Sequence, residues 1–145
     1  MKTEDQGLYI LVINVEKGQK IKVAKLPETY YQPGFYLYVG RAKRGLRKRV
    51  DRHLRRDKKL FWHIDYLLQK SKVDEVWTRH DSLDECRTAK KIAQIAKSSL
   101  ILDNHFGASD CRCPGHLVYV AEFDELSQVR KRLAFERVKT HEIPL

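Results

Sequence analysis

The pattern of apolar and polar residues predicts β-strands in the N-terminal part of the chain. Residues 8–15 are apolar and largely β-branched, which is typical of a buried strand. After a short turn, polar and apolar residues alternate over residues 20–26, which favours a half-exposed strand. A loop bounded by prolines follows. Residues 35–39 are again apolar and predict a third strand, which ends at Gly40.

A helical period replaces this pattern in the next part of the chain. Apolar residues four positions apart predict a helix over residues 46–59, with one buried stripe. The residues of this stripe are Leu46, Val50 and Leu54. A second helix is predicted over residues 61–68. Its inward-facing side chains are predicted to be Phe61, Ile64, Leu67 and Leu68.

The second half of the chain predicts a further strand and helix in succession. Residues 72–79 contain Val, Val and Trp at strand-like spacing. A helix is predicted over residues 82–99, and Ser82 with Glu85 matches a capping box at its start.

The C-terminal part adds a loop, a strand and a helix. The composition of residues 106–115 is that of a loop, and residues 116–123 predict either another core strand or an added edge strand. Residues 124–138 predict an amphipathic helix that packs on its own sheet or on a partner subunit. We therefore expect one domain over residues 1–145, with 116–138 as a C-terminal extension. Its class is α/β (α+β), with a small, central, mainly antiparallel sheet flanked by helices.

Composition narrows the class of protein. Hydrophobic residues make up 42% and charged residues 33% of the chain, which fits a soluble globular domain. No apolar stretch approaches the roughly 20 residues that span a bilayer, and residues 1–6 lack the apolar core of a secretory signal. The three cysteines are not spaced like a disulfide framework. We therefore expect a cytoplasmic location and no membrane partner.

Positive charge is concentrated in one segment. The formal net charge is +10, and residues 41–59 contain 11 Lys and Arg residues and two Asp residues. A concentrated basic face is expected of a protein that binds phosphate backbones. A solvated basic surface without a partner is the competing interpretation.

Two tripeptides and the helix that follows them carry the most specific signal. They are Gly7-Leu8-Tyr9 and Tyr38-Val39-Gly40, followed by Arg49 and His53 on one face of the basic helix. Together they resemble the signature of the GIY-YIG nuclease superfamily. The segment 38–50 is similar to the N-terminal nuclease domain of bacterial excision-repair incision enzymes. From Gly7 to about Tyr119 the chain resembles the mainly archaeal Uri group, although an inserted strand and loop separate its two tripeptides.

The resemblance implies a catalytic role for five residues. Tyr9 or Tyr38 would activate or orient the attacking water, and a phenolic base would need nearby cations because its ordinary pKa is near 10. Arg49 would stabilise charge on the phosphoryl oxygens, and His53 would take or relay a proton. Glu85 would bind one divalent cation, Mg²⁺ or Mn²⁺.

The same residue types also occur in purely architectural roles. The tyrosines could be cross-strand packing residues, and Glu85 could only cap its helix. Glu75 and Asp84 are weaker alternatives for the metal carboxylate.

The resemblance and the charge pattern also suggest residues that bind nucleic acid. The basic residues expected to position the backbone are Lys43, Arg44, Arg47, Lys48, Arg52, Arg55 and Arg56. Residues expected to line the cleft, from the Uri-group resemblance, are His63, Ser109 and Asp110. Trp62, Tyr66 and Trp77 could stack on unpaired bases or belong to the core, and Trp62 is the best candidate for stacking.

A cysteine pair near the C-terminus forms a second constellation. Cys111, Cys113 and His116, with Cys86 as a fourth ligand, would make a zinc site, but a structural zinc site usually shows two ligand pairs. The alternative is a structural loop of small residues.

The expected function is therefore metal-dependent hydrolysis of a DNA phosphodiester bond in repair, with other DNA repair proteins as partners. The alternative is a non-catalytic accessory module that binds nucleic acid. We expect DNA rather than RNA as the target because the sequence shows no ribonucleoprotein motif. The sequence is compatible with more than one oligomeric state.

Overall fold

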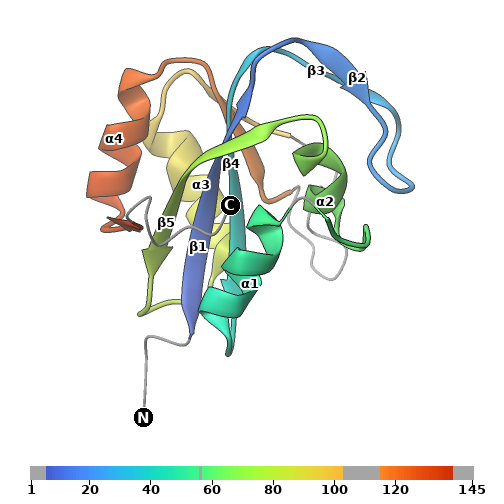
Figure 1. Cartoon of the computed structure of the whole chain (residues 1–145). Coiled ribbons are helices and arrows are strands. Elements are labelled where there is room, and N and C mark those ends of the chain that lie inside the picture. The colour runs from blue at the N-terminus through green and yellow to red at the C-terminus, as the bar shows by residue number, and fades with distance from the viewer. Residues whose placement is uncertain (1–5, 56, 103–114, 139–145) are drawn as a thin grey trace.

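The computed structural model describes residues 6–55, 57–102 and 115–138. Over these residues the chain forms an antiparallel six-stranded sheet with the order β6-β7-β4-β1-β5-β8, together with four helices (Figure 1). The strands of this sheet are β1 (Gly7–Val15), β4 (Gly34–Ala42), β5 (Lys72–Arg79), β6 (Ser99–Ile101), β7 (Leu117–Val120) and β8 (Glu136–Arg137). The helices are α1 (Leu46–Leu54), α2 (His63–Leu68), α3 (Glu85–Ile95) and α4 (Asp124–Arg132). The predicted α+β class is confirmed.

Strand β1 is buried on both faces of the sheet. Its side chains alternate between two cores, with Tyr9 and Leu11 in one and Leu8 and Ile10 in the other, and all four are at most 2% exposed. Helices α1 and α2 pack on the Tyr9 side, which we call the α1/α2 face. Helices α3 and α4 cover the opposite, α3/α4 face (Figure 1). The continuous apolar run of β1 follows from this double burial.

The two signature glycines are required by close approaches. Tyr9 pairs with Gly40 across β1 and β4, and a Cβ atom on Gly40 would lie 2.3 Å from Cζ of the Tyr9 ring. Gly7 has a φ of +148°, and a Cβ there would lie 2.3 Å from the Arg79 carbonyl oxygen of β5. A side chain at Gly40 would push the Tyr9 ring out of its place.

The segment between β1 and β4 is a separate two-stranded hairpin, β2 (Gln19–Ile21) and β3 (Thr29–Tyr31). The predicted strand over residues 20–26 is therefore too long, and part of the predicted loop is a strand. The hairpin projects beyond α2 in Figure 1. Ile21 and Tyr31 anchor it to the core on the α1/α2 face.

Helix α1 is shorter than predicted. Leu46 and Val50 are buried as expected, but the helix ends at Leu54 and Arg55 is extended. The Lys58 ammonium binds the His53 carbonyl oxygen at 2.5 Å, so it satisfies an acceptor that the helix end leaves open.

Helix α2 begins later than predicted, which changes the position of Phe61. The carboxylate of Asp65 accepts the backbone N–H groups of Phe61 and Trp62, each at 2.9 Å, and so caps a helix that starts at His63. Phe61 therefore precedes the helix and is 74% exposed. The prediction that it faces inward is wrong, whereas the predicted burial of Ile64 is confirmed.

The predicted capping box of α3 is also wrong. The carboxylate of Asp84 accepts the Arg87 N–H at 3.0 Å, and the Ser82 hydroxyl accepts the N–H of Asp84. The helix starts at Glu85, so the Glu85 side chain is not needed as a cap. Its carboxylate instead lies 3.3 Å from the Arg41 side chain and 3.6 Å from that of His116.

The C-terminal elements complete the sheet. The strand at residues 117–120 lies between β4 and β6, so it is an interior strand rather than an edge strand. Helix α4 ends at Arg132, and residues 136–137 form β8 instead of continuing the helix. Leu126 and Val129 of α4 pack on their own sheet. Among the described residues, no helix has the length and apolar character that crossing a bilayer requires.

Candidate active site

Tyr9 and His53 form a buried hydrogen-bonded pair on the α1/α2 face. The Tyr9 hydroxyl lies 2.7 Å from Nε2 of His53, and both residues are 2% exposed. Tyr9 reaches this position because Gly40 leaves space for its ring. His53 reaches it because α1 turns this residue toward the sheet beside Val50. Sequence reasoning placed both residues in the site, and the structure brings them into direct contact.

Tyr38 lies beside this pair on the neighbouring strand. Leu11, not Tyr9, is its direct partner across β1 and β4, so the two tyrosines are diagonal neighbours on one face. Their ring centroids are 6.4 Å apart, and the Tyr38 ring is edge-on to His53 at 6.1 Å. The three rings therefore form one cluster.

Burial keeps all three rings of this cluster uncharged at neutral pH. Burial raises the pKa of Tyr9, and the charge and hydrogen bond of Arg49 oppose this increase without cancelling it. Burial also raises the pKa of Tyr38, and the neighbouring Tyr9 and Glu85 add to the effect. Burial and the nearby Lys58 ammonium lower the pKa of His53 to about 3. Tyr9 is therefore a neutral phenol hydrogen-bonded to a neutral imidazole, and its hydroxyl donates to Nε2 in the tautomer that leaves Nε2 without a proton.

Arg49 is held beside the Tyr9 hydroxyl. One nitrogen of its guanidinium donates to the Arg41 carbonyl oxygen at 3.1 Å, and the group lies 4.8 Å from the centroid of the Trp62 ring. A cation over an indole face is attracted by its π electrons. The Arg41 carbonyl oxygen, the Trp62 ring and the Tyr9 hydroxyl together fix the orientation of the Arg49 guanidinium.

Glu85, in the first turn of α3, lies near the same cluster of Tyr9, Tyr38 and His53. Its carboxylate lies 3.3 Å from Nε of Arg41 and 3.6 Å from Nδ1 of His116. Its charge contributes to the raised pKa of both Tyr9 and Tyr38, so the carboxylate is within electrostatic reach of the two phenols. The five residues that the sequence assigned to catalysis therefore converge on one corner of the fold.

The donor set of this corner fits a magnesium-like ion held by one carboxylate. In the described part of the chain, no three His, Cys, Asp or Glu side chains are arranged to hold a metal ion. Mg²⁺ needs no such cluster, because it commonly binds through one or two carboxylates and completes its shell with water and substrate phosphates. Glu85, with a side chain that is 17% exposed, would supply a hard oxygen ligand of the required kind.

The predicted zinc site is described only in part. The Sγ atom of Cys86 lies 3.3 Å from Nε2 of His116, so these two predicted ligands are in contact. Cys111 and Cys113 lie outside the described residues. The zinc hypothesis stays a prediction.

The predicted nucleic-acid-binding residues fall into three groups. Five of them are exposed, namely Lys43, Arg44, Arg47, Lys48 and Arg55. Arg52 instead binds both oxygens of the Asp65 carboxylate, each at 3.1 Å, and His63 is the half-buried first residue of α2. Arg56, Ser109 and Asp110 lie outside the described residues.

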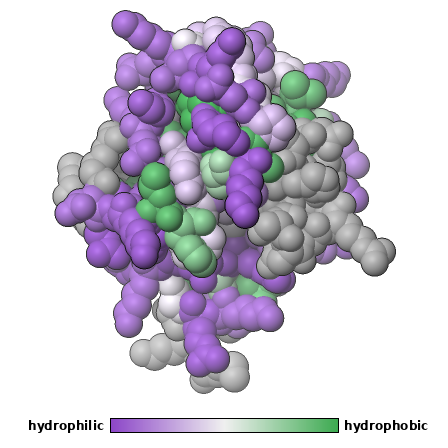
Figure 2. Space-filling view, turned by 90° about the vertical axis from the view of Figure 1, so that its right-hand side faces the viewer, coloured by the Kyte–Doolittle hydropathy of each residue, from purple (hydrophilic) through white to green (hydrophobic). Residues whose placement is uncertain are grey.

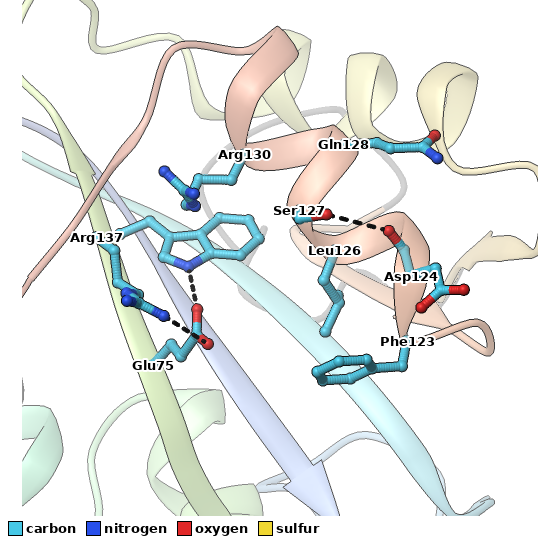
Figure 3. Close-up of a pocket in the computed structure, with 9 residues that line it drawn as sticks. Glu75, Phe123, Asp124, Leu126, Ser127, Gln128, Arg130 and Arg137 are labelled. Atoms are coloured by element: carbon cyan, nitrogen blue, oxygen red, sulfur yellow. Dashed lines mark hydrogen bonds and ion pairs between the residues drawn. The ribbon is translucent and has the colours of Figure 1, made fainter.

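The hollow beside α4 is separate from this corner. It lies on the α3/α4 face, where Glu75 binds Arg137 at 3.6 Å and accepts the indole N–H of Trp77 at 2.8 Å (Figure 3). Glu75 is therefore on the wrong face to share a metal with the tyrosines. Trp77 is 1% exposed and belongs to the core, so it cannot stack on a base. Asp84, the other alternative carboxylate, caps α3.

Sequence reasoning missed two residues that organise the site. Asp65 is completely buried and joins Arg52 to the start of α2, while Arg41 pairs with Glu85. Arg41 directly follows the second tripeptide, which is the signal that could have identified it. Only the position of Asp65 three residues after Trp62 hinted at its capping role.

Comparison with known proteins gives a family but no activity. The family model described as "Domain of unknown function DUF123" matches residues 8–139. No curated protein and no solved structure matches the chain. The matched region contains all five residues of the candidate site. This chain therefore belongs to the DUF123 family.

Proposed function

We propose that this protein is a Mg²⁺- or Mn²⁺-dependent endonuclease of the GIY-YIG type, which hydrolyses a DNA phosphodiester bond during repair. The observation that carries the proposal is the buried contact of 2.7 Å between Tyr9 and His53, with the Arg49 guanidinium beside it. In the tautomer whose Nε2 accepts from the phenol, the imidazole can take up a proton from Tyr9, and the fixed guanidinium can bind a phosphate oxygen. The resemblance of the two tripeptides to GIY-YIG nucleases supports the same chemistry.

Proton transfer in this proposal runs through Tyr9. As the water oxygen bonds to phosphorus, the bond from phosphorus to one deoxyribose oxygen breaks, and that oxygen leaves and takes a proton from solvent. The water proton passes to the Tyr9 oxygen, and the Tyr9 proton passes to Nε2 of His53. The raised pKa of Tyr9 disfavours a free phenolate, so the two transfers are coupled. Besides burial, the positive charges of nearby cations such as Lys58 lower the pKa of His53. The negative charge of bound DNA phosphates would counteract this effect of the cations and raise the pKa. His53 would then become a stronger base when substrate is bound.

The other residues stabilise and orient the substrate. Arg49 would bind the non-bridging oxygens in the fork geometry that suits a phosphate. Tyr38 keeps its proton and would donate a hydrogen bond to the water or the phosphate. Glu85 would hold the divalent ion, which when bound supplies positive charge for the leaving oxygen. Arg41, 3.3 Å from the same carboxylate, competes with the ion for it.

The exposed cations of α1 and the preceding loop would hold the DNA backbone. Four of them cluster in the sequence just after the Tyr38 strand: Lys43, Arg44, Arg47 and Lys48. Contacts to phosphates give affinity and orientation but little base selectivity. Binding should therefore weaken steeply with salt.

Cleavage of labelled DNA tests this proposal. Duplex, flap, branched and uracil-containing DNAs are incubated with Mg²⁺ or Mn²⁺ and with wild type, Arg49→Ala or Glu85→Gln. Arg132→Ala, which removes an exposed arginine at the end of α4, is the matched control. We expect cleavage by wild type and the control, and loss of cleavage with retained DNA binding in the other two. Salt-sensitive binding without cleavage of any substrate would contradict the proposal and favour the accessory binding module.

A further inference from the structure

The loop between α1 and α2 is held in place by interactions on both sides. Arg52 of α1 binds the Asp65 carboxylate through two N–H groups and the Lys59 carbonyl oxygen at 3.1 Å. Lys58 contacts the C-terminal carbonyl groups of α1. The loop is therefore tied to both helices.

Asp65 fixes the end of this loop next to the candidate active site. Its side chain is fully buried, and its carboxylate accepts two bonds from Arg52 and one N–H each from Phe61 and Trp62. A buried carboxylate with this number of donors holds their relative positions closely. The backbone at Phe61 and Trp62 is consequently defined by a group that does not reach the surface.

The ring of Trp62 is occupied by protein cations. The guanidinium carbons of Arg52 and Arg49 lie 4.3 Å and 4.8 Å from its centroid, and the His53 ring centroid is 5.4 Å away. Trp62 therefore positions the arginines, and the sequence-based expectation that it stacks on a base does not fit these contacts.

Phe61 is the aromatic side chain that this arrangement leaves exposed. It is 74% exposed, and its ring meets Trp62 edge-on with a centroid separation of 5.7 Å and an interplanar angle of 60°. Because most of the Phe61 side chain is exposed, its ring is accessible to a ligand. The side of the molecule that carries α2 and this loop is mainly hydrophilic, with small hydrophobic areas (Figure 2). Phe61 is thus an exposed apolar ring next in sequence to Trp62, whose ring contacts Arg49.

We propose that Phe61 stacks on an unpaired DNA base next to the bond that Arg49 and Tyr9 act on. This inference rests on the proposed function and narrows its substrate class to DNA with unpaired nucleotides. The exposed Arg55 and Lys59 on the same loop supply the charge that a backbone requires, while Phe61 offers a ring face. Paired bases already stack on their neighbours, so a surface phenyl ring gains little from a perfect duplex.

Fluorescence of 2-aminopurine tests this stacking without requiring cleavage. The probe is placed in a two-nucleotide bulge, in a flap, or in a perfect duplex of the same sequence, and Ca²⁺ replaces Mg²⁺. Wild type is compared with Phe61→Ala and Phe61→Trp. Phe123→Ala is the matched control, because Phe123 is 64% exposed but lies next to α4.

We expect Phe61→Ala to bind bulge and flap DNA about tenfold more weakly, as the loss of one base–aromatic stack implies, and to bind the duplex unchanged. Wild type and Phe61→Trp should quench the unpaired probe, whereas Phe61→Ala should not. Because phenylalanine carries no charge, the slope of log affinity against log salt should be the same in all variants.

Equal weakening for duplex and unpaired DNA, or no weakening at all, would overturn the stacking proposal. Tighter binding of the matching unpaired RNA would overturn the assignment to DNA. Cleavage assays in Mg²⁺ distinguish failure of the nuclease proposal from failure of the stacking proposal. If wild type quenches the probe but never cleaves, the nuclease proposal is refuted and stacking is supported. If it cleaves all DNAs equally and Phe61→Ala changes nothing, only stacking is refuted.

Discussion

The buried, uncharged His53 predicts a specific loss of stability in acid. Burial and the neighbouring Lys58 lower its pKa from 6.5 to about 3 in the folded protein. In the unfolded chain the imidazole is solvated and regains its ordinary pKa. Below pH 6.5 the unfolded state therefore binds a proton that the folded state does not bind. The free energy of unfolding must then decrease as the pH falls from 6.5 toward 3.

The size of this effect follows from the difference in pKa. Each pH unit below 6.5 removes about 1.4 kcal/mol, so the His53 contribution decreases by about 2 kcal/mol between pH 7 and pH 5. Over the full window to pH 3 the decrease approaches about 5 kcal/mol, which is a large part of the stability of a small domain.

Urea unfolding at pH 7 and pH 5 measures this contribution when wild type is compared with His53→Gln. All other ionisable groups are shared, so the difference between the two pH effects isolates His53. We expect wild type to lose about 2 kcal/mol more than the variant. Tyr9→Phe keeps the buried imidazole and should retain most of the acid effect, because burial is its main cause. An equal pH effect in wild type and His53→Gln would refute the reasoning.

Three further substitutions test the supports of the site. Gly40→Ala should reduce cleavage at least tenfold and the free energy of unfolding by about 1–3 kcal/mol, because its Cβ would overlap the Tyr9 ring; urea unfolding at the wild-type value would contradict this overlap. Asp65→Asn should lower the free energy of unfolding by about 3 kcal/mol, because its buried arginine pair is broken; a loss below about 0.5 kcal/mol in the same assay would contradict it. Arg41→Ala should lower the Mg²⁺ concentration for half-maximal cleavage, since Arg41 competes for Glu85; an increase in a Mg²⁺ titration would contradict this.

The sequence was sufficient for the elements whose pattern is local. The apolar run of β1, the repeat of Leu46 and Val50 in α1, and the succession of β4, α1, α2, β5 and α3 follow from periods that single segments carry. The tyrosine, arginine and histidine positions also came from local motifs. The structure adds the reason for Gly40, which is the approach of a ring from another strand.

The sequence was insufficient where a distant group decided the outcome. Helix α1 stops early and α2 starts late because Lys58 and Asp65 bind backbone groups that a periodic pattern does not reveal. For the same reason Phe61 moved from the predicted core to the surface. Trp62 packs against the guanidinium groups of Arg49 and Arg52, and its neighbour Phe61 is left exposed. This difference between Phe61 and Trp62 is set by the tertiary contacts of Trp62 and could not be predicted from the residue types.

Single-turnover cleavage by Tyr9→Phe, His53→Gln and the double variant tests the central claim most directly. Tyr36→Phe is the matched control, because it removes a buried tyrosine hydroxyl whose partner is the Gln32 carbonyl oxygen rather than His53. If the pair relays one proton, each single variant should slow cleavage about 10²- to 10⁴-fold, and the double variant should be no slower than either. DNA binding and cleavage by Tyr36→Phe should stay near wild type. Cleavage by Tyr9→Phe at the wild-type rate, or no cleavage by wild type itself, would contradict the account.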